Sequence, residues 1–180
     1  MSKTKLRIHH WGDKILRVKA RPVKEVNDET REILGEMYLL MKLSDGLGLA
    51  ANQAGIDLQL VVIETKEGVF KLVNPRIIRK RGSVVYEEGC LSFPGISLEV
   101  KRAKKIWVES LDEKGDPFSL EAEGVLAVAL QHEIDHINGV VFIDRVSFFK
   151  RVFLSKKLKD IAKKTKTAMR QDDLKHKNKT

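Results

Sequence analysis

The chain has 180 residues, which is enough for one domain with a buried core and short for two. Hydrophobic residues make up 42%, and no apolar run approaches the roughly 20 residues that cross a bilayer, so we expect no membrane partner. The single cysteine, Cys90, excludes an intrachain disulfide. Because no apolar stretch follows the basic first residues, we also expect no secretory signal.

The basic residues are unevenly distributed. The formal net charge of +9 lies entirely in residues 147–180, which hold 12 Lys or Arg, 3 Asp and no Glu, whereas residues 1–146 hold 22 basic and 22 acidic residues. An even basic surface would suggest general affinity for nucleic acid. A basic segment on a neutral body suggests a docking element instead.

The first predicted element is a helix that Asn27 or Asp28 can cap and that ends near residues 45–46. Its apolar residues recur at steps of three and four along one face: Ile33, Leu34, Met37, Leu40 and Met41. The following residues, 46–55, read GLGLAANQAG. This segment is too rich in glycine and alanine for a regular element.

Two strands are predicted next, at residues 58–63 and 69–73, and a turn at residues 66–68 joins them into a hairpin. The Asn-Pro pair at residues 74–75 is expected to end the second strand. Another strand starts at residues 106–108, and the sequence DEKG that follows it predicts a turn.

Helical periodicity returns from about Gly124 to Asn138, with Gly139 placed to end the helix. A last helix is predicted from about residue 147 and carries the basic residues. Short strands between helices favour the α+β class. We expect one domain over residues 1–165 and a basic, disordered tail over residues 166–180.

The strongest chemical signal is the pattern H-E-x-x-H at residues 132–136. Residues four apart share one face of a helix, so His132 and His136 can offer two imidazoles to one metal ion. Glu133 would lie beside the ion and could accept a proton from water. The alternative is a solvated helix that happens to carry two histidines, but the flanking residues are apolar, and unpaired polar groups there would be costly.

The third ligand separates the possible classes of metal site. A peptidase with a third histidine would need it at position 142, where the chain has Phe142, and no glutamate follows Glu133 to complete the other common peptidase pattern. Cys90 is the remaining candidate, although a lone cysteine is more often a small core residue. A closed structural zinc site would need a fourth ligand, and the other histidines lie near the chain ends.

Three segments together resemble the peptide deformylase family. They are GLGLAANQ at residues 46–53, EGCLS at residues 88–92 and QHEIDH at residues 131–136. Each matches its family motif at every chemical position, and they occur in the family's order. The resemblance covers residues from about 5 to 165 and implies antiparallel sheets around a central metal-site helix, with a C-terminal helix in many bacterial members.

The resemblance also implies an activity and a set of roles. The enzyme would hydrolyse the N-formyl group of the N-terminal formyl-methionine of nascent polypeptides and release formate. Cys90, His132 and His136 would bind one divalent ion, Fe²⁺ natively, with Zn²⁺, Ni²⁺ or Co²⁺ possible in preparations. Glu133 would act as general base and then general acid. The side-chain amide of Gln53 and the backbone N–H of Leu91 would stabilise the oxyanion.

Substrate-binding candidates come from the glycine segment and from the metal-site helix. Without Cβ atoms, Gly46 and Gly48 could let a peptide backbone approach and pair as an added strand. Val128 and Ala129 precede His132 on its helix face and, with Leu47, are candidates for the methionine pocket. Core packing is the default interpretation of these aliphatic residues.

The basic segment predicts a partner. Residues 147–161 read as an amphipathic helix, with Phe148, Val152 and either Ser155 or Leu154 facing the body. The candidate ribosome-binding residues on its other side are Lys156, Lys157, Lys159, Lys163 and Lys164. Since nascent chains emerge from the ribosome and bacterial relatives dock this helix near the exit of the large subunit, we expect contact with ribosomal RNA there, in the cytoplasm of a bacterium. The plain alternative is a solvated helix face.

Two other classes remain open: a metallopeptidase, and an RNA-binding module with an inert metal site. Formate release from a formyl-methionyl peptide would mark the deformylase, and cleavage of a peptide bond would mark the peptidase. An absence of turnover would mark the binding module.

Overall fold

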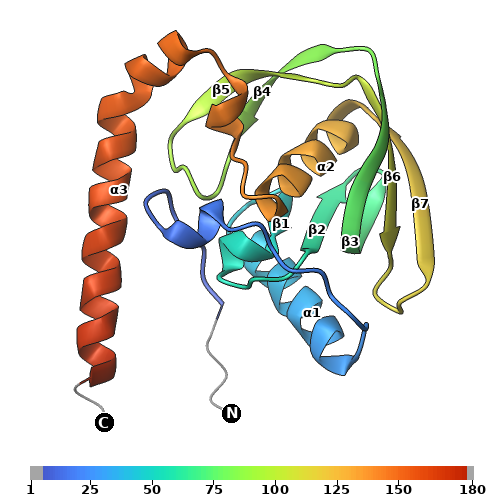
Figure 1. Cartoon of the computed structure of the whole chain (residues 1–180), viewed down its shortest axis with the longest axis horizontal. Helices are drawn as coiled ribbons and strands as arrows, with labels where there is room; N and C mark the ends of the chain where they lie inside the picture. The colour runs from blue at the N-terminus through green and yellow to red at the C-terminus, as the bar shows by residue number, and fades with distance from the viewer. Residues whose placement is uncertain (1–5, 178–180) are drawn as a thin grey trace.

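The computed structural model describes residues 6–177, with side chains to residue 171 (Figure 1). Its elements are, in chain order, η1 (Lys14–Arg17), α1 (Asp28–Leu43), β1 (Gly48–Ala50), η2 (Ala51–Ala54), β2 (Leu60–Thr65), β3 (Gly68–Arg81), β4 (Val84–Gly89), β5 (Ser97–Arg102), β6 (Lys105–Leu111), β7 (Pro117–Glu123), α2 (Gly124–Ile137), η3 (Phe142–Arg145) and α3 (Phe148–Lys177), where η denotes a 3-10 helix. The strands pair antiparallel in a five-stranded sheet, β1-β2-β3-β6-β7, and a two-stranded sheet, β4-β5. The predicted α+β class is confirmed.

Helix α2 lies at the centre of the molecule, against the five-stranded sheet (Figure 1). Leu126, Ala127, Leu130, Ile134 and Ile137 pack into one core cluster with sheet residues such as Val61 and Ile106. A helix that is apolar on nearly all sides is stable only when buried on nearly all sides. Its polar residues are therefore held in a largely water-free environment, where each needs a partner or a ligand.

The prediction that residues 74–75 end a strand is wrong, because β3 continues to Arg81. The register of β3 against β6 shifts between Val73 and Arg76, which marks a bulge. Asn74 adopts a φ of 54° there, and its side chain exchanges two hydrogen bonds of 2.8 Å with the backbone of Val23. Because the bulge takes Pro75 out of the ladder, the missing N–H of proline costs no sheet hydrogen bond.

Helix α3 begins one residue after the predicted start, and the predicted inward face is wrong at Phe148 and Val152 but right at Leu154. Phe148 and Val152 are exposed, whereas Leu154, Leu158 and Ile161 pack against the body. The helix continues past residue 165 to Lys177, within the segment 166–180 that we expected to be a disordered tail, and the last three residues of that segment lie outside the described residues. No glycine or proline interrupts the sequence from residue 148 to 177, so the helix can propagate once packing has fixed its middle turns.

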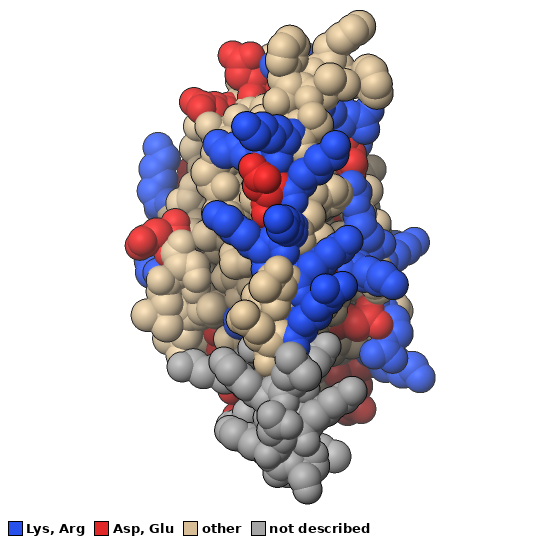
Figure 2. Space-filling model, turned by 90° about the vertical axis from the view of Figure 1, so that its left-hand side faces the viewer, with Lys and Arg blue, Asp and Glu red and all other residues tan. Residues whose placement is uncertain are grey.

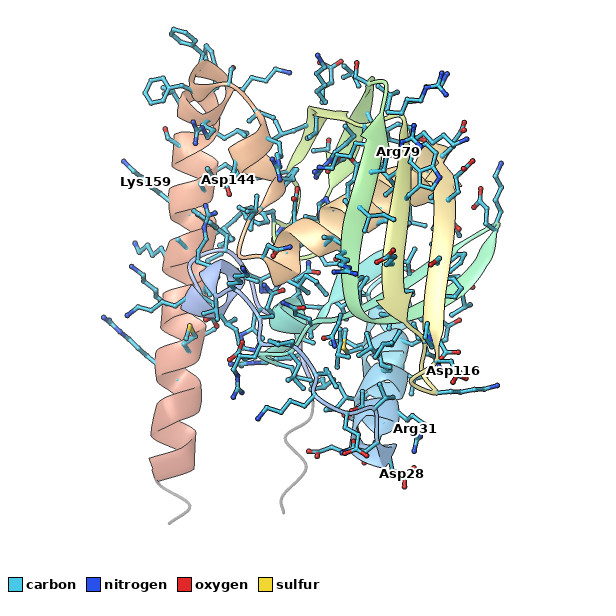
Figure 3. All side chains as sticks on the ribbon, turned by 45° about the vertical axis from the view of Figure 1, so that its right-hand side comes forward. Asp28, Arg31, Arg79, Asp116, Asp144 and Lys159 are labelled. Carbon is cyan, nitrogen blue, oxygen red and sulfur yellow. The ribbon has the colours of Figure 1, made fainter. Side chains whose placement is uncertain are left out.

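Asp144 ties the N-terminal segment to the turn after α2. Its carboxylate accepts from Arg17 at 2.5 and 3.1 Å and from the backbone N–H of Val141 at 3.0 Å. Burial raises the pKa of Asp144, but the hydrogen bonds from Arg17 and Val141 outweigh it, so the pKa lies below its usual range. Figure 3 shows Asp144 on the segment between α2 and α3.

We expect Asp144→Asn to lower the free energy of unfolding by about 1 kcal/mol at neutral pH, because this partly exposed ion pair is screened by water. A depressed folded pKa gives stability that is present above the unfolded pKa of about 3.9 and is lost as pH falls through the folded value. Urea unfolding of both proteins should therefore show a difference that shrinks below about pH 4. A difference that grew on acidification would contradict this assignment.

Candidate active site

Helix α2 presents His132 and His136 one turn apart, with ring centroids separated by 5.0 Å. Both imidazoles are buried, as the H-E-x-x-H pattern in an apolar helix requires. The predicted helix is confirmed, as is its end at Gly139, which has a φ of 73°. Phe142, where one class of peptidase would carry its third histidine, instead packs its ring 5.8 Å from that of His132.

Cys90 follows directly after β4 and reaches the two histidines. Its Sγ lies 3.3 Å from Nε2 of His136, and the ligand atoms of Cys90, His132 and His136 all lie within 4.8 Å of one another. Cys90 is 42 positions from His132 in the sequence, yet the three side chains converge on one point, between the end of β4 and α2. The structure brings the predicted triad together.

The chemistry of this donor set fits a divalent ion of the Zn²⁺ or Fe²⁺ kind. One thiolate and two imidazoles are the ligands that such ions favour, and three protein ligands leave a position open. Burial lowers the pKa of His136, and the nearby positive charges of His132 and Arg102 lower it further, so its ring is neutral and keeps a lone pair for a metal. Burial also opposes charge on His132, but its contacts with Cys90 and Glu88 raise its pKa well above the usual value. Negative groups that stabilise a protonated ring would stabilise a metal cation at the same place.

A second set of buried charges holds His132 in position. The Glu88 carboxylate lies 2.8 Å from Nδ1 of His132 and accepts from Arg102 at 2.6 and 2.9 Å. Arg102 also donates to Asp135 at 2.5 Å, and Asp135 accepts from Arg145 at 3.0 Å. Burial raises the pKa of Glu88, but these donors bring it below its usual value, so the carboxylate stays charged. With Nδ1 engaged by Glu88, the other ring nitrogen of His132 is directed to the triad.

Glu133 is buried beside the triad and next to β1. A Cβ on Gly48 would meet Oε1 of Glu133 at 2.6 Å, so only glycine leaves room for this carboxylate. Among the residues that the structure describes, Oε2 has no hydrogen-bond partner. Burial raises the pKa of Glu133 to about 7, with the charge of His132 opposing the rise. A carboxyl group with such a pKa can both take and give a proton near neutral pH.

Gln53 lies in η2 and contacts the loop that follows β4. Its Oε1 accepts from the backbone N–H of Ala50 at 2.8 Å, and its Nε2 lies 3.2 Å from Oγ of Ser92 and 3.4 Å from Sγ of Cys90. Leu91, the other predicted oxyanion donor, follows Cys90 directly. Both predicted donors thus neighbour Cys90, Gln53 through a contact with its sulfur and Leu91 as the next residue in the chain.

A cavity of about 520 Å³ opens onto this cluster. Edge strand β1 and the segment before it border one side, and β4 with the loop after it borders another. All five predicted substrate-binding residues line the cavity: Gly46, Leu47, Gly48, Val128 and Ala129. Val125, Gln53, Cys90, Leu91, His132 and Glu133 line it too. The cavity therefore joins an apolar slot to the group of candidate catalytic residues.

The family model of polypeptide deformylases matches residues 5–152. The chain belongs to this family. Its members are metal-dependent hydrolases, and this enzyme removes the N-formyl group from nascent peptides. The predictions of family, activity and fold are thereby confirmed, whereas the roles of individual residues stay predictions.

Several relatives show how far the likeness extends. A peptide deformylase of Thermoanaerobacter pseudethanolicus is 51% identical over 138 residues, which cover 77% of this chain and 87% of the relative. One from Neisseria meningitidis is 42% identical over 163 residues, or 89% and 98% of the two chains. The crystal structure of the Thermus thermophilus deformylase matches with a TM-score of 0.83 at 39% identity, over 88% and 98% of the chains. A plant peptide deformylase gives 0.87 at 33% identity, over 93% and 95%.

Sequence reasoning missed four polar residues that support the deformylase site. Glu88 and Arg102 orient His132, and Ser92 holds the amide of Gln53. Asn52 donates through Nδ2 to the backbone carbonyl of His136 and so links η2 to α2. Glu88 carried one usable signal: alternate residues of a strand share a face, so Glu88 should point to the same side as Cys90.

Proposed function

We propose that Cys90, His132 and His136 hold one divalent metal ion and that Glu133 moves the proton during deformylation. The convergence of this triad beside an unpartnered carboxylate oxygen, at the floor of the cavity, carries the proposal. A bound ion lowers the pKa of its water from 15.7 to about 7 and stabilises charge on a carbonyl oxygen. The protein contributes the remaining chemistry.

Glu133 accepts a proton from the attacking water as the new C–O bond forms at the formyl carbon. Charge builds on the formyl oxygen, where Nε2 of Gln53 and the backbone N–H of Leu91 are proposed to donate. The proton then passes from Glu133 to the amine nitrogen, and the C–N bond breaks. Formate leaves, and the peptide keeps a free N-terminal methionine. A pKa near 7 lets Glu133 serve in both transfers.

The substrate is proposed to lie as an extended strand along the edge of β1. Within the described sheets, β1 pairs only with β2, so its other edge is available at Gly46 and Gly48. The methionine side chain would enter the slot formed by Val128 and Ala129, with Leu47 at its mouth. A slot of aliphatic side chains favours an unbranched apolar side chain over a charged one.

The direct test is formate release from formyl-Met peptides by metal-loaded enzyme under anaerobic conditions. We expect stoichiometric formate and a free methionine, with all peptide bonds intact. Cleavage of a peptide bond would identify a peptidase, and an absence of formate would leave the triad without its proposed use.

The native ion is proposed to be Fe²⁺. Cys90 is partly exposed, and a metal ion bound to it would be accessible to solvent. Both the thiolate and a ferrous ion would therefore be accessible to oxidants. We expect the Fe²⁺ enzyme to lose activity in air and the Ni²⁺ or Co²⁺ enzyme to keep it. Activity half-lives, together with the mass of the peptide that contains Cys90, measure this. Equal half-lives would contradict the proposal.

The basic stretch of α3 is proposed to bind ribosomal RNA near the nascent-chain exit of the large subunit, in the cytoplasm. Lys156, Lys157, Lys159, Lys163 and Lys164 are all exposed. Figure 3 shows Lys159 pointing away from the body, and Figure 2 shows basic side chains over much of this face. Within the described residues no helix is long and apolar enough to cross a membrane.

A charge-neutralised variant tests this better than truncation, because removing the chain after residue 160 would also remove the buried Ile161. We expect Gln at Lys156, Lys159, Lys163 and Lys164 to weaken ribosome binding at low salt and to leave short-peptide deformylation intact. The slope of log affinity against log salt should fall by about 0.9 for each lost phosphate contact. The matched control places Gln at four exposed lysines of the body: Lys24, Lys66, Lys101 and Lys104. Equal affinities of the two variants for ribosomes would mean that the lysines of α3 form only a solvated helix face.

A further inference from the structure

The first two turns of α3 expose a cluster of large apolar side chains. The exposed fractions are 67% for Phe148, 75% for Phe149, 50% for Val152 and 88% for Phe153. The chain has seven phenylalanines, and the four others are buried or half-buried. Three exposed phenylalanines within six residues are more than scattered surface residues would give, and a grouped apolar surface of this kind marks an interaction site.

Packing of α3 on the body does not use these side chains. At about 100° per residue, the four cluster residues occupy one side of the helix. The body-facing residues Leu154, Leu158 and Ile161 occupy another. The cluster residues are thus a separate outward face, which we call the aromatic face (Phe148, Phe149, Val152 and Phe153).

Basic residues flank the aromatic face along α3, and Glu87 and Glu99 of the β4–β5 sheet border it on the side of the body. Lys150 and Arg151 lie within it in sequence, and Lys156 and Lys157 follow in the next turn, all of them exposed. Two contacts with the body hold this end of the helix: Lys150 lies 3.4 Å from Glu99 of β5, and Lys157 donates to the carbonyl of Gly95. Figure 2 shows uncharged side chains gathered at the upper end of this face and many Lys and Arg side chains below them, with some Asp and Glu among these.

We propose that the aromatic face and its flanking basic residues anchor the enzyme peripherally to a bilayer that contains anionic lipid. Phenylalanine side chains bury their rings at the boundary of headgroups and acyl chains, while Lys and Arg bind the lipid phosphates. Such binding needs no membrane span, but it departs from our expectation from the sequence that the chain has no membrane partner. The inference goes beyond deformylation, because none of the four aromatic-face residues lines the substrate cavity.

The position of the aromatic face suits a flat surface. The first turns of α3 lie at one edge of the molecule, beside the β4–β5 sheet (Figure 1), and their aromatic side chains are exposed. Phe153 and Lys150 border a shallow depression on that sheet, and Glu87 lines both this depression and the substrate cavity. An enzyme bound in this way would therefore hold its cavity close to the lipid surface.

Charge argues against the two other occupants. A second copy of the chain would place one basic surface against another, and the like charges would repel. An RNA surface would attract the lysines but would leave an aliphatic group such as Val152 without an apolar environment. An anionic bilayer offers negative charge outside and an apolar layer beneath, in the order that this surface requires.

Cosedimentation of the full chain with lipid vesicles tests the proposal. We expect binding to vesicles of phosphatidylglycerol and phosphatidylcholine, weaker binding at high salt, and little binding to phosphatidylcholine alone. The triple variant Phe148→Ala, Phe149→Ala and Phe153→Ala should weaken vesicle binding by at least about tenfold, because it removes the three rings that would be buried in the bilayer. A matched control changes three exposed aliphatic residues elsewhere to Ala: Leu39, Leu43 and Ile78.

The outcomes separate the proposal from its rivals and from the ribosome proposal. Both triple variants should keep wild-type formate release, and thermal unfolding checks that each is folded. Absence of wild-type binding to the anionic vesicles, or equal binding by the two triple variants, would overturn the membrane anchor. If the wild-type protein did not bind vesicles and the phenylalanine variant lost affinity for ribosomes, the aromatic face would be part of the ribosome-binding surface. Concentration-dependent dimers that the same variant abolished, again without vesicle binding, would assign it to a second copy.

Discussion

Glu133→Gln is expected to keep its bound metal and to lose most of its turnover, with kcat falling by about 10² to 10⁴. Glutamine has the size of glutamate but cannot accept the proton of the attacking water. The two other carboxylates that contact or adjoin the histidines are already engaged: Glu88 is held by Arg102 and His132, and Asp135 is held by Arg102 and Arg145. Steady-state formate release, with metal content measured on the same sample, tests the prediction.

The controls for Glu133→Gln separate chemistry from folding. The exposed Glu29 on α1 gives a matched control, and Glu29→Gln should behave as wild type. Because the buried, high-pKa carboxyl of Glu133 is already partly protonated at neutral pH, its neutral replacement should not destabilise the fold. A variant with near-normal kcat would show that another base operates, and a variant without metal would mean that Glu133 supports the ligands.

The triad could be predicted from the sequence because its signals are local or belong to the family. The spacing of His132 and His136 places them on one helix face whatever the rest of the fold does. Cys90 was reached by elimination, as the remaining candidate for a third ligand, and the family motif agreed with it, since spacing alone could not bring it to α2. The pairing of Glu88 with Arg102 was not predictable, because it requires the β4–β5 sheet. Residues 97–102 alternate as a strand would, but residues 84–89 show no clear alternation that favours one.

Helix α3 shows a different limit of sequence reasoning. Its sequence has two apolar groups on different sides, one around Phe148 and Val152 and one around Leu154, Leu158 and Ile161. Periodicity detects both and cannot say which one the body covers. Only the path of the chain out of η3 decides this, and it leaves the aromatic group outside (Figure 1). The aromatic group, part of which we expected to face the body, is therefore exposed and forms a candidate interaction surface.

Gln53→Ala is expected to lower kcat by about 10² or more, with a smaller change in KM. Charge on the formyl oxygen exists in the transition state and hardly in the substrate, so a donor aimed at that oxygen acts mainly on kcat. The amide is already oriented: the backbone N–H of Ala50 donates to its oxygen at 2.8 Å, and one of its two N–H groups donates to Ser92 at 3.2 Å. The other N–H, which lies toward Cys90 at 3.4 Å, is the one that would turn to the formyl oxygen. Because the fold orients the amide beforehand, little free energy is spent on orienting it as the transition state forms.

The same contacts supply the control for Gln53→Ala. The substitution leaves the buried N–H of Ala50 without its acceptor, which should cost about 1–3 kcal/mol of unfolding free energy. Gln59→Ala removes an amide that donates to the carbonyl of Ala20 at 3.0 Å, away from the substrate cavity, and so loses stability without touching the oxyanion. If both variants lost stability but only Gln53→Ala lost kcat, the amide would act on the reacting oxygen. If Gln53→Ala kept wild-type kcat, the Gln53 amide would serve the fold and not the reaction. Leu91 would then be the protein's remaining candidate donor.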